Sequence, residues 1–349
     1  MASQAIAFGC ERRLASVVSP PSARVAFIDV ARGLCIVLVV AMHATLGVGE
    51  AMDGRGFMHT LVDFAKPFRI PAFFLVAGLF ACAAAHAPWR RFIDGKILHF
   101  VYFYVLWAAI QIFLKDFVAD HFAARDAARA LLYALVEPYG VLWFIFVLPI
   151  FYSVVRVTQP LGAALVAPAA LLLNIATIRT GWSAIDQFAE YFVYFYIGAT
   201  LGPHIIGAVQ RVLAARALAV MGLAWWAAIE AAATLTAGSG AIWTAPGANL
   251  AFGLAGGGAV LVLSGLLAPT WLGQVLSFVG RRSLIVYLAF FLPMAAMRVA
   301  LVRIGWIGDV GAASLVVTAV AVIAPLALSR LAGRMRLGFL FTRPKALRL

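Results

Sequence analysis

The chain has 349 residues, of which 64% are hydrophobic and only 12% are charged. Soluble domains contain roughly 45–50% apolar and about 25% charged residues, so this composition excludes a water-soluble globular protein. The net charge of +13 does not indicate nucleic-acid binding, because the basic residues lie in short segments between apolar blocks, a pattern typical of membrane topology.

The apolar residues form blocks of about 20 residues, which at 1.5 Å per residue cross a hydrocarbon core of about 30 Å. Because lipid offers the backbone no hydrogen bonds, we predict an all-α, polytopic transmembrane bundle of about ten membrane-spanning helices. The ten predicted spans are 25–47, 64–85, 97–117, 140–157, 160–178, 187–203, 214–236, 248–268, 282–303 and 310–332. The amphipathic segment 121–136 is predicted to be a helix in the membrane interface.

Arginine and lysine are concentrated in alternate loops. One set of loops contains Arg90, Arg91, Lys96, Arg211, Arg216, Arg281 and Arg282, together with the basic residues of both terminal segments. By the positive-inside rule, both termini are cytoplasmic. We therefore expect a cytoplasmic tail at 1–24 without the pattern of a cleaved signal, a transmembrane domain at 25–335 and a basic cytoplasmic tail at 336–349.

The first span contains three ionisable residues, Asp29, Arg32 and His43. A charge in lipid is costly, so such residues are functional-site candidates. Arg32 and His43 are separated by three helical turns plus roughly 20°, which places both on one helix face about 16 Å apart. Asp29 precedes Arg32 by three residues, the spacing of an ion pair. The spacing alone leaves an alternative open. In that alternative neither residue has a catalytic role: the Arg32 side chain extends to the membrane surface, and His43 is a packing residue of the core.

The second span reads FAKPFRIPAFFLVAGLF and begins with Lys66, Pro67, Arg69 and Pro71. Proline removes backbone donors, so an irregular helix start is expected, which the membrane tolerates beside protein or water. Arg69 is then expected to face an aqueous site on the outer side. Simple anchoring of a helix end by Lys66 and Arg69 is the alternative.

Four motifs carry a resemblance to a known family. They are Asp29-x-x-Arg32-Gly33 with ten residues between Arg32 and His43; Pro71, Phe73, Phe74 and Gly78; Leu142, Trp143 and Phe144; and Gly280, Arg281, Ser283, Tyr287 and Leu288. In these motifs the chain resembles the acyltransferase 3 family of membrane O-acyltransferases over residues 24–335. It departs from the family pattern at Ala77, where a serine is common, and at Phe290, where a histidine is frequent.

The resemblance implies transfer of an acetyl or short acyl group from a cytoplasmic acyl-CoA, such as acetyl-CoA, to a hydroxyl of an extracytoplasmic glycan or glycolipid. It implies a multi-pass protein of the bacterial inner membrane. No metal is expected, because His59, His86, His99, His121 and His204 show no ligand spacing. His43, with Arg32 and Asp29, is the predicted catalytic group, either as a general base or as a transient acyl carrier. Arg32 is also predicted to contact the donor. The predicted acceptor-binding residues are Arg69, Lys66, Glu137, Tyr139, Trp143 and Glu190.

A transporter or flippase of a polysaccharide or lipid-linked precursor is the alternative function. Transporters often contain inverted repeats with broken helices in both halves. Here the prolines and charges lie in the first two spans, which disfavours that function. Glu230, inside a later span, is predicted either to pair with Arg298 or to line a pore. Two Gly-x-x-x-Gly pairs, at 198–202 and 253–257, are predicted to pack helices closely.

Overall fold

The structure, a computed structural model, describes residues 21–118, 124–236, 245 and 247–349. Its principal helices are α2 (Pro21–Ala51), α3 (Phe57–Ala65), α4 (Arg69–Gly78), α5 (Ala81–Ala85), α6 (Trp89–Phe92), the π-helix η1 (Ile93–Leu98), α7 (His99–Val118), α8 (Ala124–Ala134), α9 (Trp143–Val157), α10 (Ala163–Ile175), α11 (Ser183–Ala214), α12 (Arg216–Thr236), α14 (Ala248–Leu267), α15 (Trp271–Gly280), α16 (Ser283–Ala289), α17 (Phe291–Ile304) and α18 (Val310–Arg334). Short 3-10 turns lie at η2 (Gly140–Leu142), η3 (Gln159–Leu161), η5 (Gly338–Leu340) and η6 (Lys345–Leu347). The described residues contain no β-strand, which confirms the all-α prediction.

Seven helical segments are long and apolar enough to cross a membrane. They are Ala26–Ala51, Trp89–Lys115, Gly140–Val157, Ser183–Ala214, Arg216–Thr236, Ala248–Leu267 and Val310–Arg334. An eighth is obtained if α16 and α17, which are bent by 54° relative to each other, count as one span. The chain is therefore a membrane protein with several apolar helices, but the predicted number of ten is not confirmed. The side of the membrane on which the termini lie stays a prediction.

Three predicted spans, 64–85, 160–178 and 282–303, are not among the seven. The predicted span 160–178 contains only the 13 residues of α10, which are about 20 Å long. The predicted span 187–203 is one of the seven and lies within the 32-residue α11, which extends beyond it to Ala214. The ten-residue α15 lies between two predicted spans and was not predicted at all.

The second predicted span is broken, as its prolines indicate. It contains the end of α3 and the short helices α4 and α5, separated by turns at residues 66–68 and 79–80. Pro71 lies in the first turn of α4, where a missing N–H costs nothing because the first four donors of a helix have no partner within it. The expected irregularity is therefore confirmed, and it produces a short helix that begins at Arg69 and ends at Gly78.

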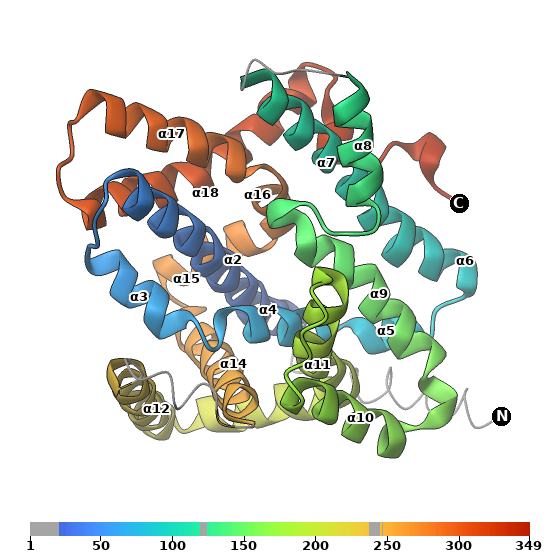
Figure 1. The fold of residues 1–349 in the computed structure, drawn as a ribbon. Helices are drawn as coiled ribbons and strands as arrows, with labels where there is room; N and C mark the ends of the chain where they lie inside the picture. Colours follow the sequence, from blue (N-terminus) through green and yellow to red (C-terminus); the bar gives the residue numbers. More distant parts are fainter. Residues whose placement is uncertain (1–20, 119–123, 237–244, 246) are drawn as a thin grey trace.

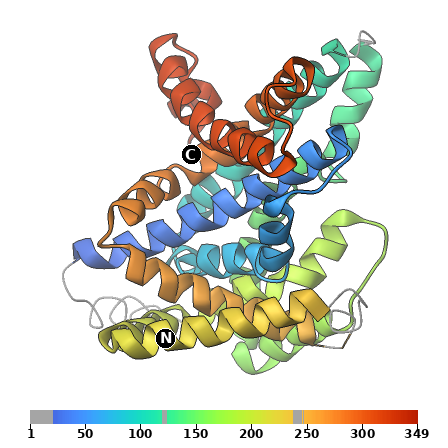
Figure 2. The ribbon, with the colours of Figure 1, turned by 90° about the vertical axis from the view of Figure 1, so that its left-hand side faces the viewer.

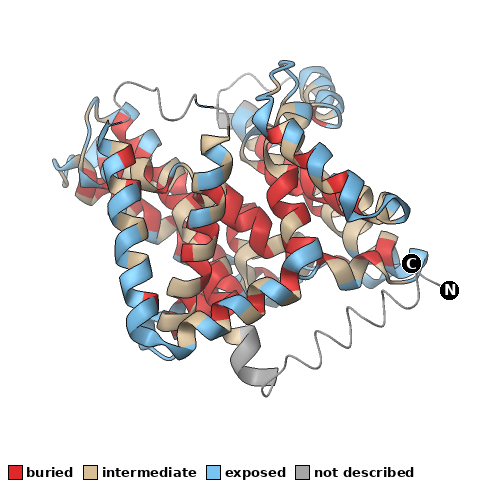
Figure 3. Cartoon of the chain, turned by 90° about the horizontal axis from the view of Figure 1, so that it is seen from below, coloured by how far each residue is buried: buried red, intermediate tan, exposed pale blue. Residues whose placement is uncertain are grey.

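α2 runs through the middle of the molecule, with the other helices arranged around it (Figure 1). α12 and α18 lie on opposite sides of it (Figure 2). In the most apolar stretch of α2, 61% of the residues are buried, against 17% in α12. Buried residues accordingly gather in the centre and exposed ones on the peripheral helices (Figure 3). α2 is thus a core helix, whereas the outer face of α12 suits contact with lipid.

Glycines bring the central helices into backbone contact. A Cβ at Gly280 of α15 would lie 1.8 Å from the carbonyl oxygen of Asp29, and one at Gly33 of α2 would lie 2.0 Å from that of Leu276. α4 and α11 meet in the same way through Gly78 and Gly198. The packing role predicted for the Gly-x-x-x-Gly pairs is confirmed, because Gly202 lies against Leu79, Gly253 against Tyr194 and Gly257 against Leu75.

The C-terminal segment folds back onto α7 and η1. Arg343 is buried and forms an ion pair with Asp94 of η1. Trp107 donates a hydrogen bond of 2.9 Å to the carbonyl oxygen of Leu340, and Tyr102 donates one of 2.8 Å to that of Phe339. The residues predicted to form a basic tail therefore pack against the bundle.

The contact between α2 and α15 predicts the effect of Gly280→Ala. The added methyl group meets the backbone of Asp29, so the helices must separate, and overpacking of this kind costs about 1–3 kcal/mol. We expect a lower melting temperature of the detergent-purified protein, measured by loss of the monodisperse size-exclusion peak after heating. Gly222→Ala in α12 is the control, because no atom lies within 4 Å of the added Cβ. Equal melting temperatures of the two variants would contradict the proposed close contact.

Candidate functional site

Asp29 lies between two arginines at one end of α2. Its carboxylate is buried, 3.7 Å from the Arg32 guanidinium and 3.9 Å from that of Arg281. The predicted ion pair with Arg32 is confirmed. Arg281 reaches Asp29 because Gly280 holds the end of α15 against α2, and it also donates a hydrogen bond of 2.6 Å to Ser277.

Arg32 belongs to a cluster of positive charge. Its side chain is 33% exposed and lies over the ring of Phe80 at 5.0 Å. Lys96 of η1 lies close enough for the two charges to repel, and its ammonium group sits 4.7 Å from the ring centre of Tyr152. Arg32, Lys96 and Arg281 carry three positive charges against the single carboxylate of Asp29. This end of α2, the predicted cytoplasmic end, is therefore suited to bind an anion.

His43 lies further along α2 beside a second arginine. The half-buried imidazole packs against Phe290 with ring centres 5.5 Å apart. Arg69, the first residue of α4, lies close enough for its charge to act on the imidazole. One guanidinium nitrogen of Arg69 donates to the carbonyl oxygen of Val62 at 3.1 Å, while its buried Nε has no hydrogen-bond partner within the described part of the chain. His43 thus faces a polar group as well as an aromatic one.

α4 connects these two environments. Arg69 at its start lies near His43, and Phe80, just beyond its end, lies under Arg32. The two helices therefore run in opposite directions side by side. The distance from Arg69 to Phe80 is 11 residues, the same as from Arg32 to His43. The Arg32 and His43 side chains consequently both lie against the segment formed by α4 and Phe80.

A series of aromatic contacts connects three of the family motifs to His43. Phe73 and Phe74 of α4 each lie 4.5 Å from Phe144 of α9, measured between ring centres. Phe144 lies 5.6 Å from Tyr287, which in turn lies 6.4 Å from Phe290, the ring that contacts His43. The Tyr287 hydroxyl also donates to the carbonyl of Val141 and accepts from the amide of Phe144, so it fixes the start of α9. Motifs distant in sequence thus form one wall beside the imidazole.

Two of the predicted acceptor-binding residues lie near Arg69. Trp143 stacks on Tyr191 of α11 with ring centres 5.7 Å apart. Arg69 and Glu190 both lie within electrostatic reach of Tyr191. Arg69, Trp143 and Glu190 therefore surround one tyrosine, from three different helices.

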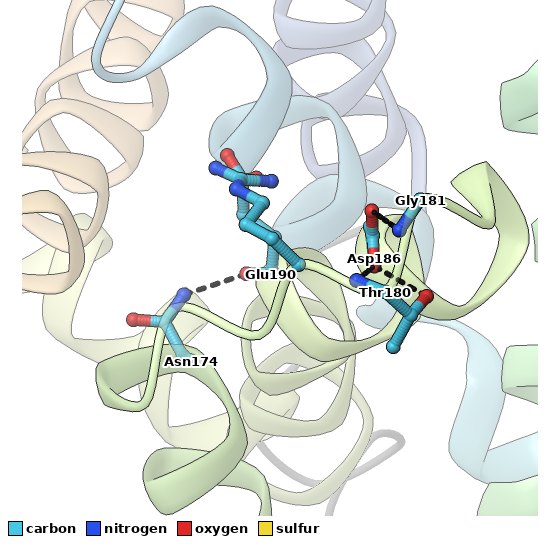
Figure 4. A network of polar contacts seen from close by, with 6 residues as sticks. Asn174, Thr180, Gly181, Asp186 and Glu190 are labelled. Carbon is cyan, nitrogen blue, oxygen red and sulfur yellow. Dashed lines mark hydrogen bonds and ion pairs between the residues drawn. The ribbon is translucent and has the colours of Figure 1, made fainter.

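Glu190 is also part of a polar network at the start of α11. Its carboxylate pairs with Arg179 at 3.0 Å, and its carbonyl oxygen accepts a hydrogen bond of 2.6 Å from Asn174. Asp186, one turn earlier, accepts hydrogen bonds from Thr180 and the amide of Gly181 (Figure 4). The network fixes the loop between α10 and α11 beside the tyrosine.

The remaining predicted acceptor-binding residues have other surroundings. Lys66 is exposed at the end of α3. Glu137 accepts hydrogen bonds from the amide and hydroxyl groups of Ser183. The backbone amide of Tyr139 donates a hydrogen bond of 3.0 Å to the hydroxyl group of Tyr104. These contacts connect the segment before α9 to α7 and α11. Glu137 and Tyr139 therefore hold this segment in place.

The predicted partner of Glu230 is engaged elsewhere. Glu230 of α12 is buried, and neither of its carboxylate oxygens has a hydrogen-bond partner among the residues that the structure describes. Arg298 of α17 instead donates to the carbonyl oxygen of Gly47, at 3.4 Å. The two residues therefore do not form an ion pair in this structure.

Sequence reasoning missed the contributions of Lys96, Arg281 and Phe290 to this site. Lys96 and Arg281 were counted only as loop charges or motif positions, because η1 and α15 were not predicted. Lys96 lies within η1 and Arg281 directly follows α15. π-helical turns are frequent at functional sites, but η1 is known only from the structure. Phe290 was noted as a departure from a family pattern, and its contact with His43 follows only from the bend between α16 and α17.

Comparison with known proteins supports the family resemblance that these motifs indicate. A family model described as an acyltransferase domain, that of acyltransferase 3, matches residues 25–330. The chain is also 24% identical over 232 residues to the inner membrane protein YcfT of Escherichia coli strain K12. The aligned region covers 57% of this chain and 64% of YcfT, less than two thirds of that relative. No solved structure matches the chain significantly.

The Asp29 cluster predicts that Asp29→Asn lowers stability. The substitution leaves Arg32 and Arg281 without their counter-charge, and because the arginines are 33% and 53% exposed we expect a cost of only about 1–2 kcal/mol. Thermal unfolding in detergent measures it. The control is Asp126→Asn in α8, whose pair with Arg129 has the same sequence spacing but is 70% and 65% exposed. A melting temperature for Asp29→Asn equal to that of the control would show that the buried pair is unimportant.

Proposed function

Because the chain belongs to the acyltransferase 3 family, we propose that this membrane acyltransferase moves an acetyl or short acyl group from cytoplasmic acyl-CoA to a hydroxyl group of an extracytoplasmic glycan or glycolipid. The observation that supports this proposal is the pair of sites along one face of α2. A positively charged cluster lies around Arg32, and a histidine beside Arg69 lies about 16 Å further along the helix. We further propose a bacterial inner membrane as its location, since YcfT is an inner membrane protein.

The cluster of Arg32, Lys96 and Arg281 suits the phosphates of the donor. Guanidinium and ammonium groups form the strong, charge-assisted hydrogen bonds by which proteins bind phosphate. The single carboxylate of Asp29 holds the two arginines in place and leaves the cluster positive. With the phosphates at this end, an extended pantetheine arm directs the thioester along α2 toward His43.

His43 suits the acceptor hydroxyl. Imidazole is the side chain best adapted to accept a proton near neutral pH. As the hydroxyl oxygen bonds to the thioester carbonyl carbon, its proton passes to His43, and collapse of the tetrahedral intermediate breaks the carbon–sulfur bond. The thiolate leaves with that proton as free CoA. Arg69 stands beside His43 where a positive charge stabilises the developing oxyanion.

The aromatic residues beside Arg69 suit a sugar. Trp143 and Tyr191 present stacked rings next to the carboxylate of Glu190. Ring faces contact the apolar faces of a sugar, while a carboxylate accepts hydrogen bonds from its hydroxyl groups. We therefore assign the acceptor to this side of His43.

The proposal predicts that His43→Ala loses acyl transfer. Without a base at the hydroxyl, the rate should fall at least about 100-fold, the usual contribution of general-base catalysis. The measurement is release of free thiol from acetyl-CoA by purified protein in proteoliposomes. His204→Ala, which removes an exposed histidine of α11, should keep the wild-type rate. Wild-type turnover by His43→Ala would refute the assignment, and substrate flux without thiol release would favour a transporter.

The donor site predicts a selective effect of Lys96→Gln. Loss of one charge-assisted hydrogen bond to phosphate should raise the KM for acetyl-CoA about tenfold, which corresponds to about 1.4 kcal/mol. The KM for S-acetylpantetheine, which lacks the nucleotide phosphates, should stay unchanged. Lys345→Gln, at an exposed lysine near the C-terminus, is the charge-matched control. An equal change in KM for both donors would show that Lys96 does not contact the phosphates.

A further inference from the structure

A cavity of about 520 Å³ lies between α17 and the end of α2 beyond His43. From α2 it is lined by Gly47, Glu50 and Ala51, and from α17 by Arg298, Val299, Val302 and Arg303. Its volume falls within the range of small-molecule sites. None of its residues belongs to the donor cluster or to the aromatic wall.

The cavity adjoins the proposed catalytic histidine. Gly47 follows His43 by four residues, so the two lie on the same face of α2, about 6 Å apart along the helix axis. Across the cavity, α17 begins directly after Phe290, the residue that packs against His43. A ligand in the cavity is therefore one helical turn from the imidazole.

Gly47 creates the place for a guanidinium. Arg298 lies so close to the α2 backbone that a Cβ at Gly47 would be 2.6 Å from its Nη1 atom. The guanidinium donates one hydrogen bond of 3.4 Å to the carbonyl oxygen of Gly47, and within the described ranges no carboxylate forms an ion pair with it. Its remaining donors are thus available to a ligand.

The lining indicates the chemistry of that ligand. Arg298 and Arg303 supply two positive charges against the single carboxylate of Glu50, so the cavity favours an anion. Val299 and Val302 are exposed at its edge, on α17, which with α16 is apolar and long enough to count as a bent span. A ligand with both a phosphate and a hydrocarbon chain matches the charged and the apolar parts of the lining. Its phosphate would lie on the arginines and its chain along the valines.

We propose that this cavity binds the phosphate of a lipid-linked acceptor, a lipid phosphate that carries the sugar to be acylated. The inference rests on the proposed function, because it names the class of acceptor for the same His43. The phosphate is the shared recognition element, and the hydrocarbon chain distinguishes a lipid phosphate from a free sugar phosphate.

The test is equilibrium binding of radiolabelled farnesyl phosphate to the purified full-length protein in detergent, without donor. Farnesol, which lacks the phosphate, and glucose 1-phosphate, which lacks the chain, are the unlabelled competitors. We expect both to compete at least tenfold more weakly than farnesyl phosphate. The double variant Arg298→Gln/Arg303→Gln should bind at least tenfold more weakly than wild type. Arg125→Gln/Arg129→Gln, which removes two exposed arginines of α8, should bind like wild type.

Gly47→Ala provides a second variant that retains every charge. Its methyl group displaces the Arg298 guanidinium from α2, so we expect several-fold weaker binding. If either cavity variant binds farnesyl phosphate as tightly as wild type, the proposed site is wrong. Equal competition by glucose 1-phosphate would exclude a lipid ligand. Because binding is measured without turnover, these results are independent of whether His43 catalyses acyl transfer.

Discussion

The pairing of Asp29 with two arginines is the constraint on which the site depends. A carboxylate buried in an apolar bundle must be neutralised, and Asp29 is neutralised from two directions, by Arg32 of its own helix and by Arg281 at the end of α15. The second arginine can take part only because glycines at 33 and 280 let the two backbones touch. The same contact fixes the angle of α2, the central helix, and with it the direction in which His43 points.

The broken second span supplies the residues that face Arg32 and His43 from the other side of the site. An uninterrupted helix of 20 residues would cross the membrane and keep its polar residues at the surface. The prolines and turns instead produce α4, which lies beside α2 with Arg69 near the histidine and Phe80 near Arg32. Backbone groups freed at its ends are tolerated because protein surrounds them. The broken span thus contributes a guanidinium beside His43 and an aromatic ring beside Arg32.

The sequence predicts most accurately what depends on local spacing. The burial of Asp29, its pairing with Arg32 and the irregular start of the second span follow from positions three to eleven residues apart. Features that depend on where helices end or bend cannot be predicted from the sequence in this way. The ten predicted spans measure apolar length, so they cannot detect that α10 is too short, that α11 extends beyond its apolar part, or that α16 and α17 meet at 54°. Lys96 and Arg281 were overlooked for this reason, since one lies in a short helix, η1, and the other directly follows one, α15, and a window of membrane length detects neither helix.

The two proposed binding sites explain why a single helix carries both an anion-binding cluster and an imidazole. If the donor phosphates bind near Arg32 and the acceptor binds near Arg69 and Arg298, only the acyl group has to travel between them. CoA and the acceptor can then each stay on its own side of the membrane, and neither large polar molecule must cross lipid. The separation of about 16 Å along α2 is set by three helical turns. At this distance the donor phosphates lie away from Arg69, whose positive charge stays beside His43 to stabilise the oxyanion.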